Sequence, residues 1–197
     1  VDLIHECFVK MAKEIAEFMH ISPNMQRMDS LMVAANIKNL SMLELFYTCV
    51  ANLAKTMVQR EVTLPEEQRH YIEKDDYNRY TYHNREKDVT EKIIAVMNDA
   101  EKLIEICDKT GDFDDTSEYQ LLIRLLKERT IIDDDGNRRL RKKGEIEDSS
   151  EVLLNPSDPE ATFRYKAGEK NLGYVGNVVE SVDVTGSLVT DYAYEKN

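Results

Sequence analysis

The sequence predicts an α+β fold in which a mainly helical part is followed by a β-meander. Up to about residue 130, apolar residues recur every three or four positions, the period of an amphipathic helix. Beyond about residue 155 the period falls to two, and Val- and Tyr-rich runs alternate with turn residues. With 197 residues, 42% of them hydrophobic, the chain can bury a core.

An N-terminal helix is predicted within residues 1–24, because apolar side chains there lie on one face and Pro23 ends the pattern. Residues 25–37 are expected to form the first strand of the core and contain Asp29. This run is short enough for a buried strand, although periodicity alone does not exclude a helix. The apolar positions of the first helix are Ile4, Phe8, Met11, Ile15 and Phe18.

Residues 38–132 are predicted to form a helical insertion. Ser41 and Glu44 have the spacing of a capping box, which starts a helix. Thr90 can cap a further helix, for which Gly111 is a plausible stop. Thr116 or Ser117 can start another.

Residues 133–154 are highly charged and lack a regular period, so we interpret them as an exposed linker or mobile loop. Residues 155–197 are expected to form the β-meander of the core. Within it, the turn residues 183–186 separate two Val- and Tyr-rich strands and predict a hairpin.

The composition is acidic, with 38 acidic and 26 basic residues and a formal net charge of -12. This balance argues against nucleic-acid binding, which depends on Lys and Arg, but does not settle the question. The sequence shows neither a membrane-spanning apolar run nor a signal peptide, which predicts a soluble, intracellular protein with no membrane partner. Cys7, Cys49 and Cys107 lie in apolar helical stripes and are expected to be reduced core thiols.

Several short runs resemble catalytic or metal-binding motifs but lack residues that define those motifs. The run 108–111 resembles a phosphorylated-aspartate motif without its following Thr, and the acidic runs 112–114 and 133–135 lack the later residues of a calcium loop. We interpret these three runs as helix ends or solvated turns. The sequence also lacks a zinc-protease helix, a nucleophile elbow, a P-loop and a dinucleotide fingerprint.

One carboxylate, Asp29, lies within an apolar run that reads as a strand. A buried and isolated carboxylate costs several kcal/mol, so it must be paired, capping a turn or bound to a metal. From the residues alone, pairing with Arg27 or capping near Ser30 is favoured.

The surrounding residues resemble the first catalytic-aspartate strand of bacterial insertion-sequence transposases of the DDE superfamily. This resemblance begins with residues 26–32 and 35–41. A more specific block follows at 155–168, with the Gly173-Tyr174-Val175-Gly176-Asn177 run and the segments 186–187 and 190–192 after it. The helical stretch that includes 118–122 is also similar, so the resemblance spans nearly the whole chain.

The resemblance implies a partial RNase H-like mixed sheet with a large helical insertion between its first strand and the β-meander. Asp29 matches the first of three acids that hold Mg²⁺ or Mn²⁺ in this family, and it is expected in a central strand beside the hairpin of residues 174–194. The second Asp and the Glu have no match here and are expected beyond Asn197. The chain is therefore expected to be an inactive fragment, whose first residue, Val1, also suggests a piece of a longer protein.

For the full-length protein, the resemblance implies metal-dependent DNA strand cleavage and transfer during transposition of an insertion sequence. Its expected partners are transposon-end DNA, target DNA and further copies of itself, and its expected location is the bacterial cytoplasm, associated with the nucleoid. Clustered carboxylates suit this chemistry, since two Mg²⁺ ions stabilise the attacking and leaving oxygens of phosphoryl transfer.

Two basic groups are weaker candidates for DNA contact. The first group lies within residues 138–143 and is explained about as well by a solvated loop. The second lies within residues 164–174 and is explained about as well by a solvated strand face. The Tyr-rich stretch 71–82 is better explained by packing than by base stacking. The candidates are Arg138, Arg139, Arg141, Lys142 and Lys143 in the first group and Arg164, Lys166, Lys170 and Tyr174 in the second.

A different class of function competes with the transposase. The missing pair of acids and the negative charge also fit a non-catalytic, acidic helical interaction module or a degenerate transposase remnant.

Overall fold

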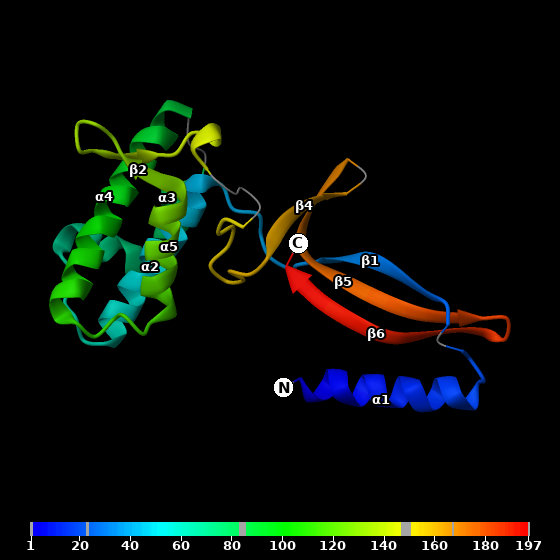
Figure 1. Ribbon diagram of the computed structural model, residues 1–197. Coiled ribbons are helices and arrows are strands. Elements are labelled where there is room, and N and C mark those ends of the chain that lie inside the picture. Colours follow the sequence, from blue (N-terminus) through cyan, green and yellow to red (C-terminus); the bar gives the residue numbers. More distant parts are fainter. Residues whose placement is uncertain (1, 23, 83–85, 147–150, 167, 197) are drawn as a thin grey trace. The chain divides into compact units, whose positions relative to one another are not determined.

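The computed structural model describes residues 2–22, 24–82, 86–146, 151–166 and 168–196. It confirms an α+β fold, with a mostly antiparallel four-stranded sheet, a separate two-stranded hairpin and several helices (Figure 1). The chain divides into two compact units. The sheet unit comprises residues 1–36 and 161–197, and the helical unit comprises residues 37–160.

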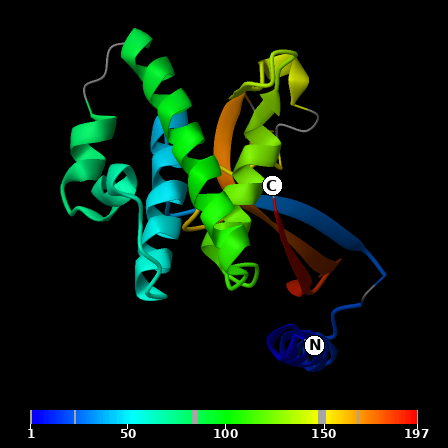
Figure 2. The same cartoon turned by 90° about the vertical axis from the view of Figure 1, so that its left-hand side faces the viewer.

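The helical unit is built on three long helices: α2 (Met42–Gln59), α4 (Glu86–Thr110) and α5 (Ser117–Arg129). They pack against one another, as the two views show (Figures 1 and 2). The 3₁₀ helix η1 (Glu66–Ile72) and the short helix α3 (Asp76–Thr81) lie between α2 and α4 in the chain. A continuous core fills this unit, with Phe46, Leu103 and Leu122 among its fully buried side chains.

Local signals place several boundaries of these helices. Ser41 and Glu44 form the predicted capping box at the start of α2. Gly111 follows the last residue of α4 with a φ of 78°, a left-handed conformation that glycine adopts readily and that ends the helix as predicted. Helix α4 begins at Glu86, so Thr90 lies inside the helix rather than capping it.

The predicted linker, residues 133–154, contains more structure than its charge suggests. Strand β3 (Arg138–Leu140) pairs antiparallel with β2 (Thr130–Ile132), and the 3₁₀ helix η2 (Lys143–Glu145) follows. Val152 and Leu153 are buried, so the apolar residues of this segment anchor it to the helical unit. Residues 147–150 lie outside the described residues.

The sheet unit joins both ends of the chain in one sheet. It consists of helix α1 (Leu3–Phe18) and the strands β1 (Gln26–Ala34), β4 (Thr162–Lys166), β5 (Glu169–Asp183) and β6 (Gly186–Lys196). The long strand β5 pairs antiparallel with each of the other three strands. The predicted hairpin is confirmed, since β5 and β6 are joined by a turn at Val184 and Thr185.

Helix α1 lies along β6 (Figure 1). The Asp2 side chain caps it by accepting hydrogen bonds from the backbone N–H groups of Ile4 and His5. Phe8 packs edge-on against Tyr192, but much of the predicted apolar face stays exposed, and Phe18 is 86% exposed. The prediction of three core thiols is wrong at Cys7, which this helix leaves exposed, and confirmed at the buried Cys49 and Cys107.

Candidate functional site on strand β1

Asp29 lies in the middle of β1, opposite Val178 of β5. Strand β5 continues into the hairpin with β6, so Asp29 lies beside the hairpin in which Val178 also pairs with Tyr192. Because cross-strand partners point to the same face of a sheet, Asp29, Val178 and Tyr192 share one face.

The expectation that Asp29 is buried in a central strand is wrong for the described residues. β1 pairs with β5 on one side and with no described strand on the other. Its apolar neighbours are exposed as well, Met28 at 71% and Leu31 at 53%. The Asp29 carboxylate is therefore solvated and escapes the desolvation cost that made a partner obligatory.

Asp29 neither pairs with Arg27 nor caps a turn, because Ser30 lies within β1. Its Oδ1 accepts a hydrogen bond of 2.8 Å from the backbone N–H of Ser30. Arg27 turns instead to Glu180 on the neighbouring strand, and its Nε donates to Oε2 over 2.6 Å. The hydrogen bond and charge of Arg27 lower the pKa of Glu180 below its ordinary value.

The described residues do not assemble a metal site around Asp29. Among them, no three His, Cys, Asp or Glu side chains come together in a way that would hold an ion. A Mg²⁺ ion takes up to six oxygen ligands and is usually held by several carboxylates or phosphates, so one solvated carboxylate does not fit the requirement. Asp29 can supply one ligand to a cluster. Glu180, two residues from Val178 on the same face of the sheet, is bound to Arg27.

The basic run of residues 138–143 is partly neutralised. Arg138 donates from Nε to Glu101 Oε1 over 2.6 Å. Arg139 makes a two-pronged ion pair with Glu145, at 2.7 and 2.9 Å, and this contact lowers the pKa of Glu145 to about 2. Arg141 donates to the backbone oxygen of Glu145.

Lys142 and Lys143 are exposed and form no salt bridge among the described residues, although the charge of Lys142 adds to that of Arg139 in lowering the pKa of Glu145. They are therefore the part of the basic run that remains available to a phosphate backbone. The helical unit that carries them holds 28 acidic and 19 basic residues, so the surrounding charge opposes DNA binding.

The other predicted DNA contacts do not share one face. Arg164 pairs with Asn171, whereas the neighbouring partners Tyr165 and Lys170 point to the opposite face. The Lys170 ammonium lies 3.4 Å from the centre of the Phe163 ring, a cation–π contact on its own sheet. Tyr174 stacks on Tyr194. Lys166 is the last residue of β4, but its side chain lies outside the described residues.

A buried polar network in the helical unit is not predictable from any motif in the sequence. Asp76 is 3% exposed and accepts hydrogen bonds from Tyr47 at 2.5 Å, His70 Nδ1 at 2.7 Å and Arg79. The network ties η1 and α3 to α2. Tyr71, Tyr77 and Tyr80 pack around Tyr47 and His70, so these members of the Tyr-rich stretch contribute to packing, as the sequence favours.

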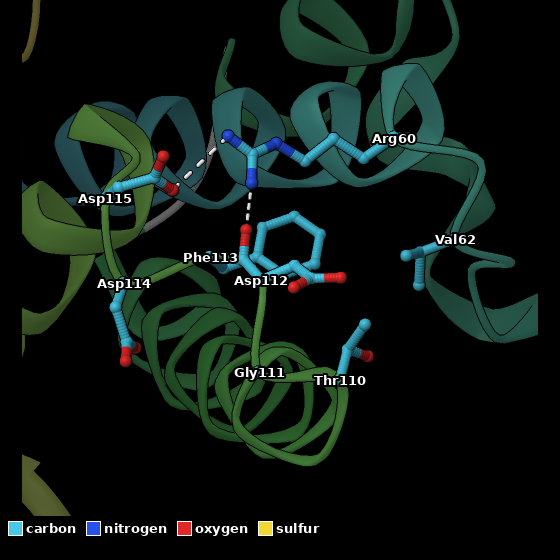
Figure 3. A pocket seen from close by; sticks show the side chains of 8 residues that line it. All are labelled: Arg60, Val62, Thr110, Gly111, Asp112, Phe113, Asp114 and Asp115. Carbon is cyan, nitrogen blue, oxygen red and sulfur yellow. Dashed lines mark hydrogen bonds and ion pairs between the residues drawn. The ribbon is translucent and has the colours of Figure 1, made fainter.

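A cavity of 510 Å³ in the helical unit lies beside the turn that follows α4 (Figure 3). Arg60 crosses it, lies over the Phe113 ring and donates to the Asp112 backbone oxygen and the Asp115 carboxylate. These contacts use the guanidinium of Arg60 to hold the acidic turn in place. The turn begins at the end of α4, in agreement with the prediction that the motif-like run 108–111 is a helix end.

Comparisons with known proteins leave the family open: no family model, curated protein or solved structure matches the chain. Among the described residues, none of the helices is long and apolar enough to span a bilayer.

Proposed function

We propose that this chain carries the first catalytic acid of a DDE transposase of an insertion sequence, within a partial RNase H-like sheet. One observation carries the proposal: Asp29 lies on a strand that runs antiparallel to the first arm of the β5–β6 hairpin. The resemblance of residues 26–32 implies this arrangement of strand, helical insertion and hairpin. The order of the elements along the chain agrees with it.

In this proposal Asp29 provides one carboxylate ligand, and the chain alone is inactive. DNA cleavage and strand transfer need a cluster of carboxylates that holds two Mg²⁺ or Mn²⁺ ions. Since the described residues form no group of three metal-ligating side chains at Asp29, the remaining acids of the cluster come from elsewhere in the active protein. The resemblance implies a central strand, whereas β1 is an edge strand among the described residues, so the proposal requires a further strand on the outer side of β1.

The second candidate function is an acidic interaction module without catalysis, including a degenerate transposase remnant. Its support is that the helical unit forms a complete core of its own while the described chain builds no metal cluster. The two proposals differ in what they require of the reading frame beyond residue 197. The transposase requires an Asp-bearing strand and a later Glu-bearing helix, and the module requires neither.

The decisive experiment follows that reading frame and, where it continues, expresses the complete protein. Asp29→Asn is then compared with the wild type in Mg²⁺-dependent cleavage of transposon-end DNA. We expect the variant to lose activity by at least about a thousandfold while its circular dichroism stays unchanged, because the amide is a poor metal ligand. Asp88→Asn, which changes an exposed carboxylate on α4, is the matched control and should cleave normally. Unchanged cleavage by Asp29→Asn would exclude the assigned role.

A further inference from the structure

In the sheet unit, β1 has the longest outer edge along which no described strand or helix lies. On the opposite side of the sheet, α1 lies along β6, where His5 pairs with Asp191 and Phe8 packs on Tyr192. Strand β1 is nine residues long, whereas β4 is five residues long. An open edge with exposed apolar side chains favours pairing with another strand.

The hydrogen bonds at the two ends of β1 show which of its backbone groups point towards β5 and which point outwards. The Met25 carbonyl accepts from Val182, and the Ala35 N–H donates to Leu172. Because the hydrogen-bonding groups of a strand alternate between its two sides, the odd-numbered residues bond to β5. The even-numbered residues, including Gln26 and Met28, therefore direct their backbone groups outwards.

We propose that the β1 edge is the contact surface for a second copy of this chain, paired antiparallel about a twofold axis at Met28. The twofold register places Arg27 opposite Asp29 of the second copy, and Asp29 opposite the second Arg27. The two Met28 residues then face each other. Met25, which is 60% exposed, lies opposite Leu31. The proposal rests on the edge and its charges, and it concerns the 197-residue chain by itself. In the proposed transposase, the acid-bearing strand that must approach Asp29 would compete with the second copy for this edge.

Charge complementarity selects this register over its neighbours. A twofold axis at residue 29 would set Asp29 against Asp29, and one at residue 27 would set Arg27 against Arg27; like charges at directly opposed positions are destabilising. An axis at residue 30 would place each charge opposite an apolar side chain, Val33 or Leu31. In the proposed register Arg27 lies between Glu180 of its own sheet and Asp29 of the partner, so the charges alternate along the row.

The first test is the mass of the 197-residue chain by sedimentation equilibrium over a range of concentrations, which should show a reversible dimer. Two charge variants follow. Asp29→Lys sets like charges against Arg27. Arg27→Glu sets like charges against Asp29, and it is made together with Glu180→Lys so that the ion pair within the chain keeps its attraction. Each variant alone should dimerise at least about tenfold more weakly than the wild type.

An equimolar mixture of the two variants provides the critical measurement. In the mixed dimer both opposed positions are again oppositely charged, so dimerisation should return to within about threefold of the wild type. A wild-type chain that stays monomeric would overturn the proposal. So would a mixture that associates no better than either variant alone. Circular dichroism of each variant confirms that the fold is retained.

The second test uses thiol crosslinking in a Cys7→Ser background, which removes the exposed native thiol. Across the axis the two residues at position 28 would be a hydrogen-bonded pair with Cα atoms about 5.5 Å apart, within the range of a disulfide. Met28→Cys should therefore form a covalent dimer on mild oxidation. Met32→Cys, on the same face but away from the axis, is the matched control and should remain mainly monomeric. Equal crosslinking of both variants would reject this register.

Discussion

Gly173 of β5 lies directly against the backbone of Val33 at the end of β1. A Cβ atom on Gly173 would overlap the Val33 carbonyl oxygen and come within 2.6 Å of the Ala35 nitrogen. The φ of Gly173 is 149°, a conformation that other residues rarely adopt. The close approach of β1 to β5 at this point therefore requires glycine.

Gly173→Ala should destabilise the sheet unit by at least about 2 kcal/mol, because the backbone must shift or the β1–β5 pairing must loosen. Hydrogen exchange of the β1 amides should report the loss. Gly176→Ala is the control on the same strand, since its added Cβ would meet the Val33 side chain at an ordinary 3.7 Å. Equal effects of the two variants would contradict this account of Gly173.

Asp76→Ala should destabilise the helical unit by about 3 kcal/mol in urea unfolding followed by circular dichroism. The substitution strands the buried Tyr47 hydroxyl and removes the acceptor of His70 and Arg79. The neighbouring Asp75→Ala removes an exposed carboxylate without a side-chain capping bond and should cost less than about 0.5 kcal/mol. A similar small effect at Asp76 would show that the network contributes little.

The Glu44 carboxylate should make the free energy of unfolding of the helical unit fall at acid pH. Burial raises its pKa, but hydrogen bonds from Lys38, Ser41 and Tyr77 outweigh burial and lower it from 4.5 to about 2. A group whose pKa is lowered by folding stabilises the protein above its unfolded pKa and loses this contribution as the pH falls. The contribution should therefore be present above pH 4.5 and disappear between pH 4.5 and about 2.

Glu44→Gln should flatten this part of the pH profile and cost about 1 to 2 kcal/mol at neutral pH. The measurement is the free energy of unfolding by urea at a series of pH values. Glu66→Gln is the control, because that side chain is 81% exposed. A profile of Glu44→Gln that keeps the wild-type slope would assign the acid sensitivity to other groups.

The chain alone should bind duplex DNA weakly, with a Kd above about 10 μM at 150 mM salt, because acidic residues outnumber basic ones. Of the run 138–143, Lys142 and Lys143 remain for phosphate contact. Exchanging both for Gln should weaken binding further and reduce its salt dependence, measured by fluorescence anisotropy. The same exchange at the exposed Lys55 and Lys74 should have less effect. Tight, salt-resistant binding would place the contacts elsewhere.

Features encoded by neighbouring residues were predictable from the sequence. The Ser41 cap, the Gly111 helix end and the turn between β5 and β6 depend on residues within a few positions of one another. The strand at residues 26–34 was also predicted, but its exposure was not, since that depends on which elements cover β1 from elsewhere in the chain.

The charged segment after α5 shows the same limit. The hydrophobic periodicity of this segment does not show that β3 pairs with β2. Nor does it show that Arg138 and Arg139 bind acidic side chains. Asp29 was singled out as the one carboxylate in an apolar run, but the diversion of Arg27 to Glu180 involves a residue 153 positions away.

The pairing of β1 with β5 also affects the order in which the chain folds during its synthesis. Ala34 pairs with Gly173, and the whole helical unit is encoded between them. At a synthesis rate of about 5 to 20 residues per second, β1 is synthesised roughly 7 to 28 s before that partner. The helical unit, whose core needs neither strand, can fold during this interval. β1 must wait as an unpaired apolar segment, so slow translation through the helical unit lengthens its exposure to chaperones, proteases and other nascent chains.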